Sequence, residues 1–417
     1  MSDRFLIRQL ANLALTANAT RPFPGEPASV PAFFAGWLTA ELAPHLLAVT
    51  AADTITHVAR RGVSGRGDKL ALAAAATSAV GYARLMGAGQ GAGNEVEQAL
   101  REALGDNYRD ELAHAPTPAD LATPWRRLIN PFRMADVDVV AHRRLPYAPG
   151  GKRFELDVYT HRDAPRNAPV LFQVHGGAWM IGHKQQQGIP LMMHLAARGW
   201  VCVAANYPLS PRAKWPEHLV ALKRAMHWIR EHAGEYGADP SFVAVTGGSA
   251  GGHLAAMLAL TADDTSLQPG FEAADTSVQA CVPHYGMYDF TADSGRKYTQ
   301  ARIDSLLRKY VMSADAVYPD DYRSASPICR ITPDAPPFFV IHGTNDTLIP
   351  VPDARDFVAK LRETSREPVA YAEIRGAQHA FDIFPSIRSA HVVRGVQRFL
   401  DVCFTRAVAR GSAPRPA

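Results

Sequence analysis

A serine between glycines is the residue with the clearest chemical potential in this chain. Gly247-Gly248-Ser249-Ala250-Gly251 fits the pattern G-x-S-x-G, and the apolar run at residues 243–245 precedes it. At a sharp turn from a strand into a helix, such a serine projects its hydroxyl from the sheet, and the glycines let strand and helix approach. A dinucleotide-binding turn would need the order G-x-G-x-x-G and a later acidic residue, which are both missing. We therefore predict that Ser249 is a nucleophile.

Three further segments with suitable side chains each follow an apolar run. His175-Gly176-Gly177-Ala178-Trp179 follows residues 170–174, Asp346 follows residues 338–341, and His379 follows residues 369–374. Ligands of a parallel sheet bind beyond the carboxyl ends of its strands, so we expect these segments to meet. The chain order Ser, Asp, His is typical of α/β-hydrolases.

The expected roles follow from the chemistry of acyl transfer. His379 would accept the proton of Ser249 and later return it to the leaving group, while Asp346 would hold the imidazole tautomer. The backbone N–H groups of Gly176, Gly177 and Ala250 would stabilise the oxyanion.

Other histidines have competing positions. His253 comes one helical turn after Ser249 and is expected to point along the helix. We expect His342 to form structural hydrogen bonds, His175 to brace the oxyanion loop, and His284 to line the pocket.

Two aspartates compete with Asp346 for the acid role, namely Asp289 and Asp382. Asp382 lies only three residues after His379 and would have to reach back locally. The position of Asp346 after the preceding strand favours Asp346.

The elements that must position these residues predict an α/β fold. Alternation at residues 137–141 and 154–158 indicates an antiparallel hairpin. Solid apolar runs then alternate with helical patterns, which predicts a doubly wound, mostly parallel sheet with antiparallel N-terminal strands. The expected strands are 170–174, 200–205, 242–246, 278–282, 338–341 and 369–374; the expected helices are 191–198, 217–232, 250–260, 352–362 and 386–408.

Residues 1–130 show helical periodicity and no strand-like alternation. We expect this region to be a cap, an interface or a membrane-facing surface, with loops at residues 62–67 and 87–93. The catalytic domain is predicted at residues 131–408, with a helical insertion at about 290–335 over the active site, and residues 409–417 are expected to be a disordered tail.

Composition narrows the function further. The chain has 417 residues, is 47% hydrophobic and has a net charge of +4 without a basic block, which argues against nucleic acid. The four cysteines lack metal-site spacing. We expect no metal and no cofactor. The N-terminus lacks a signal-peptide pattern and residues 70–83 are too few to span a bilayer, so we expect a cytoplasmic or peripherally envelope-associated protein.

The motifs at residues 175–179 and 247–252, with Asn206-Tyr207-Pro208 and Asp239-Pro240, resemble the hormone-sensitive-lipase-like (bacterial family IV) esterases of the α/β-hydrolase superfamily. Residues 35–44 resemble the N-terminal region of mycobacterial and related actinobacterial Lip-type carboxylesterases. The resemblance implies a serine carboxylesterase for short- to medium-chain acyl esters. The family usually has a third glycine at Ala178 and often an acid at Gly248.

Relatives with the same motifs include kynurenine formamidases, so an arylformamidase remains an alternative. A catalytically inactive α/β-hydrolase scaffold is a further alternative. The natural substrate and the oligomeric state are not determined by these motifs.

Overall fold

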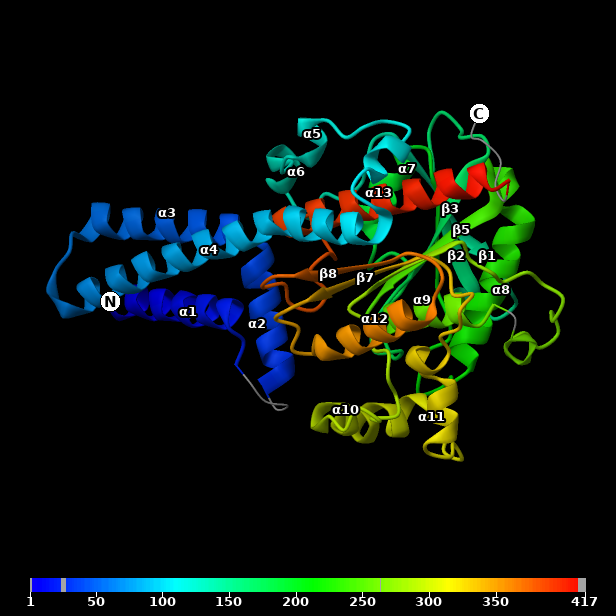
Figure 1. Ribbon diagram of the computed structural model, residues 1–417. Coiled ribbons are helices and arrows are strands. Elements are labelled where there is room, and N and C mark those ends of the chain that lie inside the picture. The colour runs from blue at the N-terminus through cyan, green and yellow to red at the C-terminus, as the bar shows by residue number, and fades with distance from the viewer. Residues whose placement is uncertain (1, 24–27, 263, 412–417) are drawn as a thin grey trace.

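The computed structural model in Figure 1 describes residues 2–23, 28–262 and 264–411. Its centre is an eight-stranded sheet with the order β1-β2-β4-β3-β5-β6-β7-β8. β2 pairs antiparallel with β1 and β4, and the other neighbouring strands are parallel. The predicted sheet is therefore confirmed. The strands are β1 (Val139–Pro146), β2 (Glu155–His161), β3 (Ala168–Val174), β4 (Val201–Ala205), β5 (Ala238–Gly248), β6 (Ala280–His284), β7 (Phe338–Gly343) and β8 (Val369–Ile374).

Helices cover both faces of the sheet, so the parallel strands are buried on both sides. Alternate residues of β5 point to opposite faces of the sheet and so belong to two hydrophobic cores. Phe242 and Ala244 face the first core, and Val243 and Val245 face the second. The second core is covered by α8 (Glu217–His232), α9 (Ala250–Leu260) and α12 (Pro352–Thr364). The first is covered by α7 (Ile189–Ala196), α13 (Ile387–Ala409) and the second half of α4 (Gly65–Leu104).

A helical arm extends from the sheet domain (Figure 1). It consists of α1 (Ser2–Thr20), α3 (Ala43–Arg61) and the first half of α4, and both α1 and α3 pack on α4. α2 (Ser29–Glu41) lies between the arm and β8 in Figure 1. Short helices α5 (Pro118–Leu121) and α6 (Trp125–Leu128) lead to the sheet. The second half of α4 contributes Val96 and Leu100 to a sheet core, so this part of the N-terminal region shares its packing with the catalytic domain.

The loop predicted at residues 87–93 was wrong, because this segment lies inside α4. Its glycines permit close packing. A Cβ on Gly89 would lie 3.3 Å from the Ile387 side chain, and a Cβ on Gly93 would lie 3.0 Å from Nδ1 of His391. Packing against α13 therefore outweighs the low helix propensity of glycine. At residues 62–67, the loop ends earlier than expected, because α4 begins at Gly65.

The insertion contains α10 (Lys297–Arg302), a π-helix at Ile303–Val311 and α11 (Asp320–Ser324). It packs beside α12, where the Tyr298 hydroxyl donates to Asp353. At its start, Phe290 meets Trp179 edge to face at 5.5 Å between ring centroids. Residues 412–417 of the expected disordered tail lie outside the described residues, and residue 409 still belongs to α13.

Among the described helices, α4 is long and apolar enough to cross a membrane by length and composition, and a third (33%) of its most apolar window is buried. The bent pair of α2 and α3, at 81°, passes the same test only when taken together. The apolar stretch noted at residues 70–83 is thus part of a longer helix than expected.

Candidate active site

Ser249 occupies the sharp turn between β5 and α9. Its backbone lies at φ 60° and ψ −122°, a conformation that side chains other than glycine rarely adopt and that persists where surrounding contacts enforce it. Its N–H donates to the carbonyl of His284 at 3.0 Å. A Cβ on Gly247 would lie 2.4 Å from the Gly251 carbonyl oxygen, and one on Gly251 would lie 2.2 Å from that of Val174. The flanking glycines are therefore required by the close approach of strand and helix.

Asp346 and His379 come together at the ends of β7 and β8. Nδ1 of His379 lies 2.7 Å from Oδ2 of Asp346, and both side chains are buried. The other carboxylate oxygen accepts the N–H groups of Leu348 and Ile349 at 2.9 and 2.8 Å. The loop thus fixes the carboxylate and directs one oxygen at the imidazole.

The same contacts set the charge of Asp346. Burial alone would raise its pKa, but the charge interaction with His379 and a hydrogen bond from His342 outweigh burial and hold the pKa well below its usual range. The carboxylate is therefore ionised at neutral pH, as required to stabilise an imidazolium.

Two aromatic rings pack on His379. Tyr285 lies 4.7 Å away between ring centroids, and Phe33 of α2 meets the imidazole edge to face at 5.9 Å. Hydrogen bonds hold α2 and α1 on the acid loop: Thr347 donates to the Ser29 carbonyl at 2.9 Å, and Asn345 donates to that of Ala19 at 3.2 Å. The N-terminal region therefore forms one wall of the site.

The loop at residues 175–179 differs from the expected arrangement in the partner of one amide. The N–H of Gly176, one of the expected oxyanion donors, instead donates to Oε1 of Gln187 at 2.7 Å. Gly177 and Ala178 follow in left-handed conformations, with φ of 117° and 52°. Within the described part of the chain, no acceptor takes their N–H groups. The free amides of this loop are thus those of Gly177 and Ala178, one residue further along than expected.

The competing histidines have structural roles. His253 is buried and its Nε2 lies 2.8 Å from the Ala325 carbonyl. Nε2 of His342 lies 2.7 Å from the carbonyl oxygen of Ile349. His175 stacks on Tyr207 at 4.4 Å and binds the Gly176 carbonyl at 2.8 Å, so it braces the oxyanion loop. Burial lowers the pKa of His175 to about 4, which keeps it neutral.

Asp382 belongs to a second buried pair. It lies 2.7 Å from Nδ1 of His284 and accepts the hydroxyl of Tyr285, rather than contacting His379. Asp289 accepts the N–H of Thr291 in a local turn. A Cβ on Gly248 would lie 2.6 Å from the Tyr285 hydroxyl, which explains why this position lacks an acidic side chain.

Sequence reasoning missed three residues that shape the site: Gln187, Gln378 and Phe33. Oε1 of Gln378 accepts the N–H groups of Thr347 and His379, at 2.8 and 2.9 Å, and so joins the acid and histidine loops. Gln378 was detectable as the neighbour of His379, whereas Gln187 and Phe33 have no motif.

Within the residues that the structure describes, no group of three or more His, Cys, Asp or Glu side chains is arranged to hold a metal ion. The absence of a metal and of a cofactor from the reaction stays a prediction.

The sheet, the serine turn and the paired Asp346 and His379 define the class of α/β-hydrolases with a nucleophile elbow. The family model described as BD-FAE matches residues 156–361. The chain is 44% identical to the probable carboxylic ester hydrolase LipM of Mycobacterium tuberculosis over 348 residues, covering 82% of this chain and 80% of LipM. It is 39% identical to Esterase LipQ of the same organism, over 96% of this chain and 92% of LipQ.

A solved esterase from Thermogutta terrifontis, Est2, has the same fold, with a TM-score of 0.51 and 23% identity over 68% of this chain and 96% of Est2. The chain belongs to the family of Lip-type, hormone-sensitive-lipase-like carboxylic ester hydrolases. The resemblance stated from the sequence is thereby confirmed.

Proposed function

We propose that this protein is a serine carboxylesterase that cleaves short- to medium-chain acyl esters through an acyl-Ser249 intermediate. The observation that carries the proposal is the 2.7 Å contact between His379 and an ionised Asp346, on the fold and in the chain order of a serine hydrolase. The family membership supports the ester as the scissile group, because LipM and LipQ are named as a carboxylic ester hydrolase and an esterase.

In this mechanism, Oγ of Ser249 attacks the ester carbonyl carbon while His379 accepts the hydroxyl proton. The N–H groups of Gly177, Ala178 and Ala250 stabilise the oxyanion of the tetrahedral intermediate. The intermediate collapses with cleavage of the bond to the alcohol oxygen, and His379 gives its proton to the departing alcohol. Water then attacks the acyl-serine by the same route, which releases the carboxylic acid and restores Ser249.

We propose that residues 131–408 carry the chemistry and that the N-terminal region covers the site. The position of Phe33 against His379 supports a cover that restricts the acyl group. Peripheral membrane association of the arm is proposed as well. It is supported by exposed aliphatic side chains near the turn between α3 and α4, including Ile55, Val63 and Leu70, beside Arg66 and Lys69.

The test is covalent labelling with a fluorophosphonate, followed by mass spectrometric mapping, together with hydrolysis of p-nitrophenyl acetate, butyrate, octanoate and palmitate. We expect an adduct on Ser249, loss of labelling and turnover in Ser249→Ala, and highest turnover on the shorter chains. Faster hydrolysis of N-formylkynurenine than of any ester would make the arylformamidase the better assignment. A folded protein that neither reacts with the probe nor hydrolyses these substrates would favour the inactive scaffold.

A further inference from the structure

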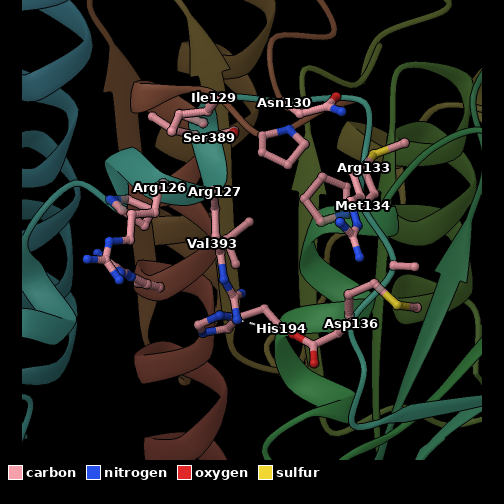
Figure 2. A pocket seen from close by; sticks show the side chains of 18 of the residues that line it. Arg126, Arg127, Ile129, Asn130, Arg133, Met134, Asp136, His194, Ser389 and Val393 are labelled. Carbon is pink, nitrogen blue, oxygen red and sulfur yellow. Dashed lines mark hydrogen bonds and ion pairs between the residues drawn. The ribbon is translucent and has the colours of Figure 1, made fainter.

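A cavity lies away from the serine turn, between the linker of residues 124–137, α7 and α13 (Figure 2). Its volume is about 640 Å³, which is in the range of small-molecule sites. Arg127 and Arg133 on the linker, Arg198 just after α7, and Arg394 on α13 line it. Ser249, Asp346 and His379 do not line this cavity.

The positive charge of the cavity is only partly neutralised. Arg127 pairs with Asp136 at 3.2 Å, and Asp136 is the carboxylate that lines the cavity. Arg198 donates to the carbonyl and to Nδ1 of His194, both at 3.2 Å, and Arg394 donates to the Ala122 carbonyl. Neither Arg198 nor Arg394 has an ion-pair partner among residues 2–23, 28–262 and 264–411. The hydrogen-bond acceptors of these two guanidinium groups are therefore neutral, although the charge of Asp120 acts on both without forming an ion pair.

A buried network fixes Arg198 in this position. His194 is 8% exposed, and burial together with the charges of nearby arginines lowers its pKa to about 3, so its ring is neutral. Its Nδ1 accepts from Arg198, and its Nε2 therefore carries the hydrogen and donates to Oε1 of Gln397 at 2.7 Å. Gln397 in turn donates to Asp401 at 3.1 Å. The arginine is thus oriented before any ligand binds.

Part of the cavity wall is apolar. Ile129 and Val137 are 75% and 71% exposed, the two highest exposed fractions among the large hydrophobic side chains of the described residues, and both line the cavity with Met193 and Val393. A small inorganic anion would leave this wall uncovered. An aliphatic tail would bury it.

We propose that this cavity binds an anionic amphiphile, with a carboxylate or phosphate head on Arg198, Arg394 and Arg133 and an aliphatic tail along Ile129, Val137 and Met193. Guanidinium groups bind such oxyanions through paired N–H donors. The site does not depend on the serine chemistry, and its occupant can be a free fatty acid or a lipid with a phosphate head.

Calorimetric titration of the full chain with four probes tests the proposal: decanoate, decyl phosphate, decanol and inorganic phosphate. We expect the two anionic amphiphiles to bind and the other two to bind at least about tenfold more weakly, because a hydrogen-bonded charge and a buried tail each contribute. The tighter of decanoate and decyl phosphate shows whether the site prefers a carboxylate or a phosphate head group.

Variants locate the binding. Arg198→Ala is expected to weaken decanoate about tenfold, and Ile129→Ser to weaken decanoate without changing phosphate. Arg366→Ala removes an exposed arginine elsewhere and is expected to change neither. Ser249→Ala is expected to keep the affinity, which separates this cavity from product binding at the serine.

Thermal unfolding checks that Arg198→Ala stays folded. If Arg198→Ala does not fold, Ile129→Ser still tests the proposal, because residue 129 is exposed and its substitution is expected to leave the fold intact. Equal affinity for decanol, equal affinity for phosphate alone, unchanged decanoate binding in both variants, or no binding to the wild type would overturn the proposal.

Discussion

At the scale of single residues, Gln187 is the side chain that most directly controls the oxyanion loop. Its Oε1 takes the N–H of Gly176 at 2.7 Å and thereby orients the next two amides. We expect Gln187→Ala to lower kcat about tenfold with a smaller change in KM. Misplaced N–H donors would stabilise the oxyanion of the transition state less well, while substrate binding would change little.

Gln187→Glu keeps an acceptor at the same position and should recover most of this loss. Steady-state kinetics on p-nitrophenyl butyrate measures both variants. An unchanged kcat in Gln187→Ala would show that the loop holds its shape without this contact.

Asp401 gives a pH-dependent prediction at the same scale. Burial raises its pKa from 3.8 to about 6, despite hydrogen bonds from Gln397 and Trp200. Because its pKa is higher in the folded state, Asp401 contributes stability at pH values below its pKa in the unfolded chain. This contribution is lost as the pH rises through about 6. From pH 4.5 to 7.5, the wild type should therefore lose up to roughly 2 kcal/mol of unfolding free energy relative to Asp401→Asn. Urea unfolding at several pH values measures this difference, and parallel pH profiles would contradict it.

At the scale of elements, one buried ion pair joins α2 to α13. Glu41 and Arg388 are each 1% exposed, Arg388 donates to Glu41, and the Ser386 hydroxyl donates to the same carboxylate at 2.6 Å. Burial raises the pKa of Glu41 even though the charge of Arg388 opposes the change. The pair fixes α2, and α2 places Phe33 on His379.

We expect Glu41→Ala to lower the free energy of unfolding by about 3–5 kcal/mol, because it leaves the Arg388 charge buried without a partner. Turnover should fall as well, since α2 loses its anchor. The double variant Glu41→Met with Arg388→Met should be closer to the wild type in stability. Denaturant unfolding and ester hydrolysis measure both effects. Equal losses in the single and double variants would argue against the ion-pair explanation.

At the scale of the whole molecule, the turn between α3 and α4 lies at the end of the arm that is away from the sheet (Figure 1), and Val63, Arg66 and Leu70 belong to this part of the chain. We expect Val63→Asp with Leu70→Asp to reduce cosedimentation with anionic phosphatidylglycerol vesicles, because both substitutions oppose apolar insertion and attraction to the lipid charge. Val317→Asp, at another exposed apolar residue, is the control.

Turnover of a soluble ester should stay unchanged in these variants. Point variants are preferable to truncation, because α4 completes a sheet core. Two outcomes would contradict membrane association: no binding of the wild type to vesicles, or equal binding of the wild type and all variants.

The residues that follow strand ends could be predicted from the sequence, whereas the contacts between segments distant in the chain could not. Ser249, Asp346 and His379 each follow an apolar strand, and parallel strands bring such ends together. The hydrogen bond from the Gly176 N–H to Gln187 was not predicted, because Gln187 carries no local sequence signal. The helix through residues 87–93 was missed because its stability comes from α13, more than 290 positions away. The contact of Phe33 with His379 was missed for the same reason, because it joins segments far apart in the sequence.

The ion pair between Glu41 and Arg388 joins residues 347 positions apart. During synthesis on the ribosome, α4 emerges long before α13, so the apolar face on the second half of α4 stays uncovered until α13 has been made. A message shortened by the codons of α13 would encode Ser249, Asp346 and His379 and still yield a chain that cannot close its core. α13 therefore decides when the second half of α4 is covered, and a chain that stops before α13 is expected to be as inactive as one without the serine.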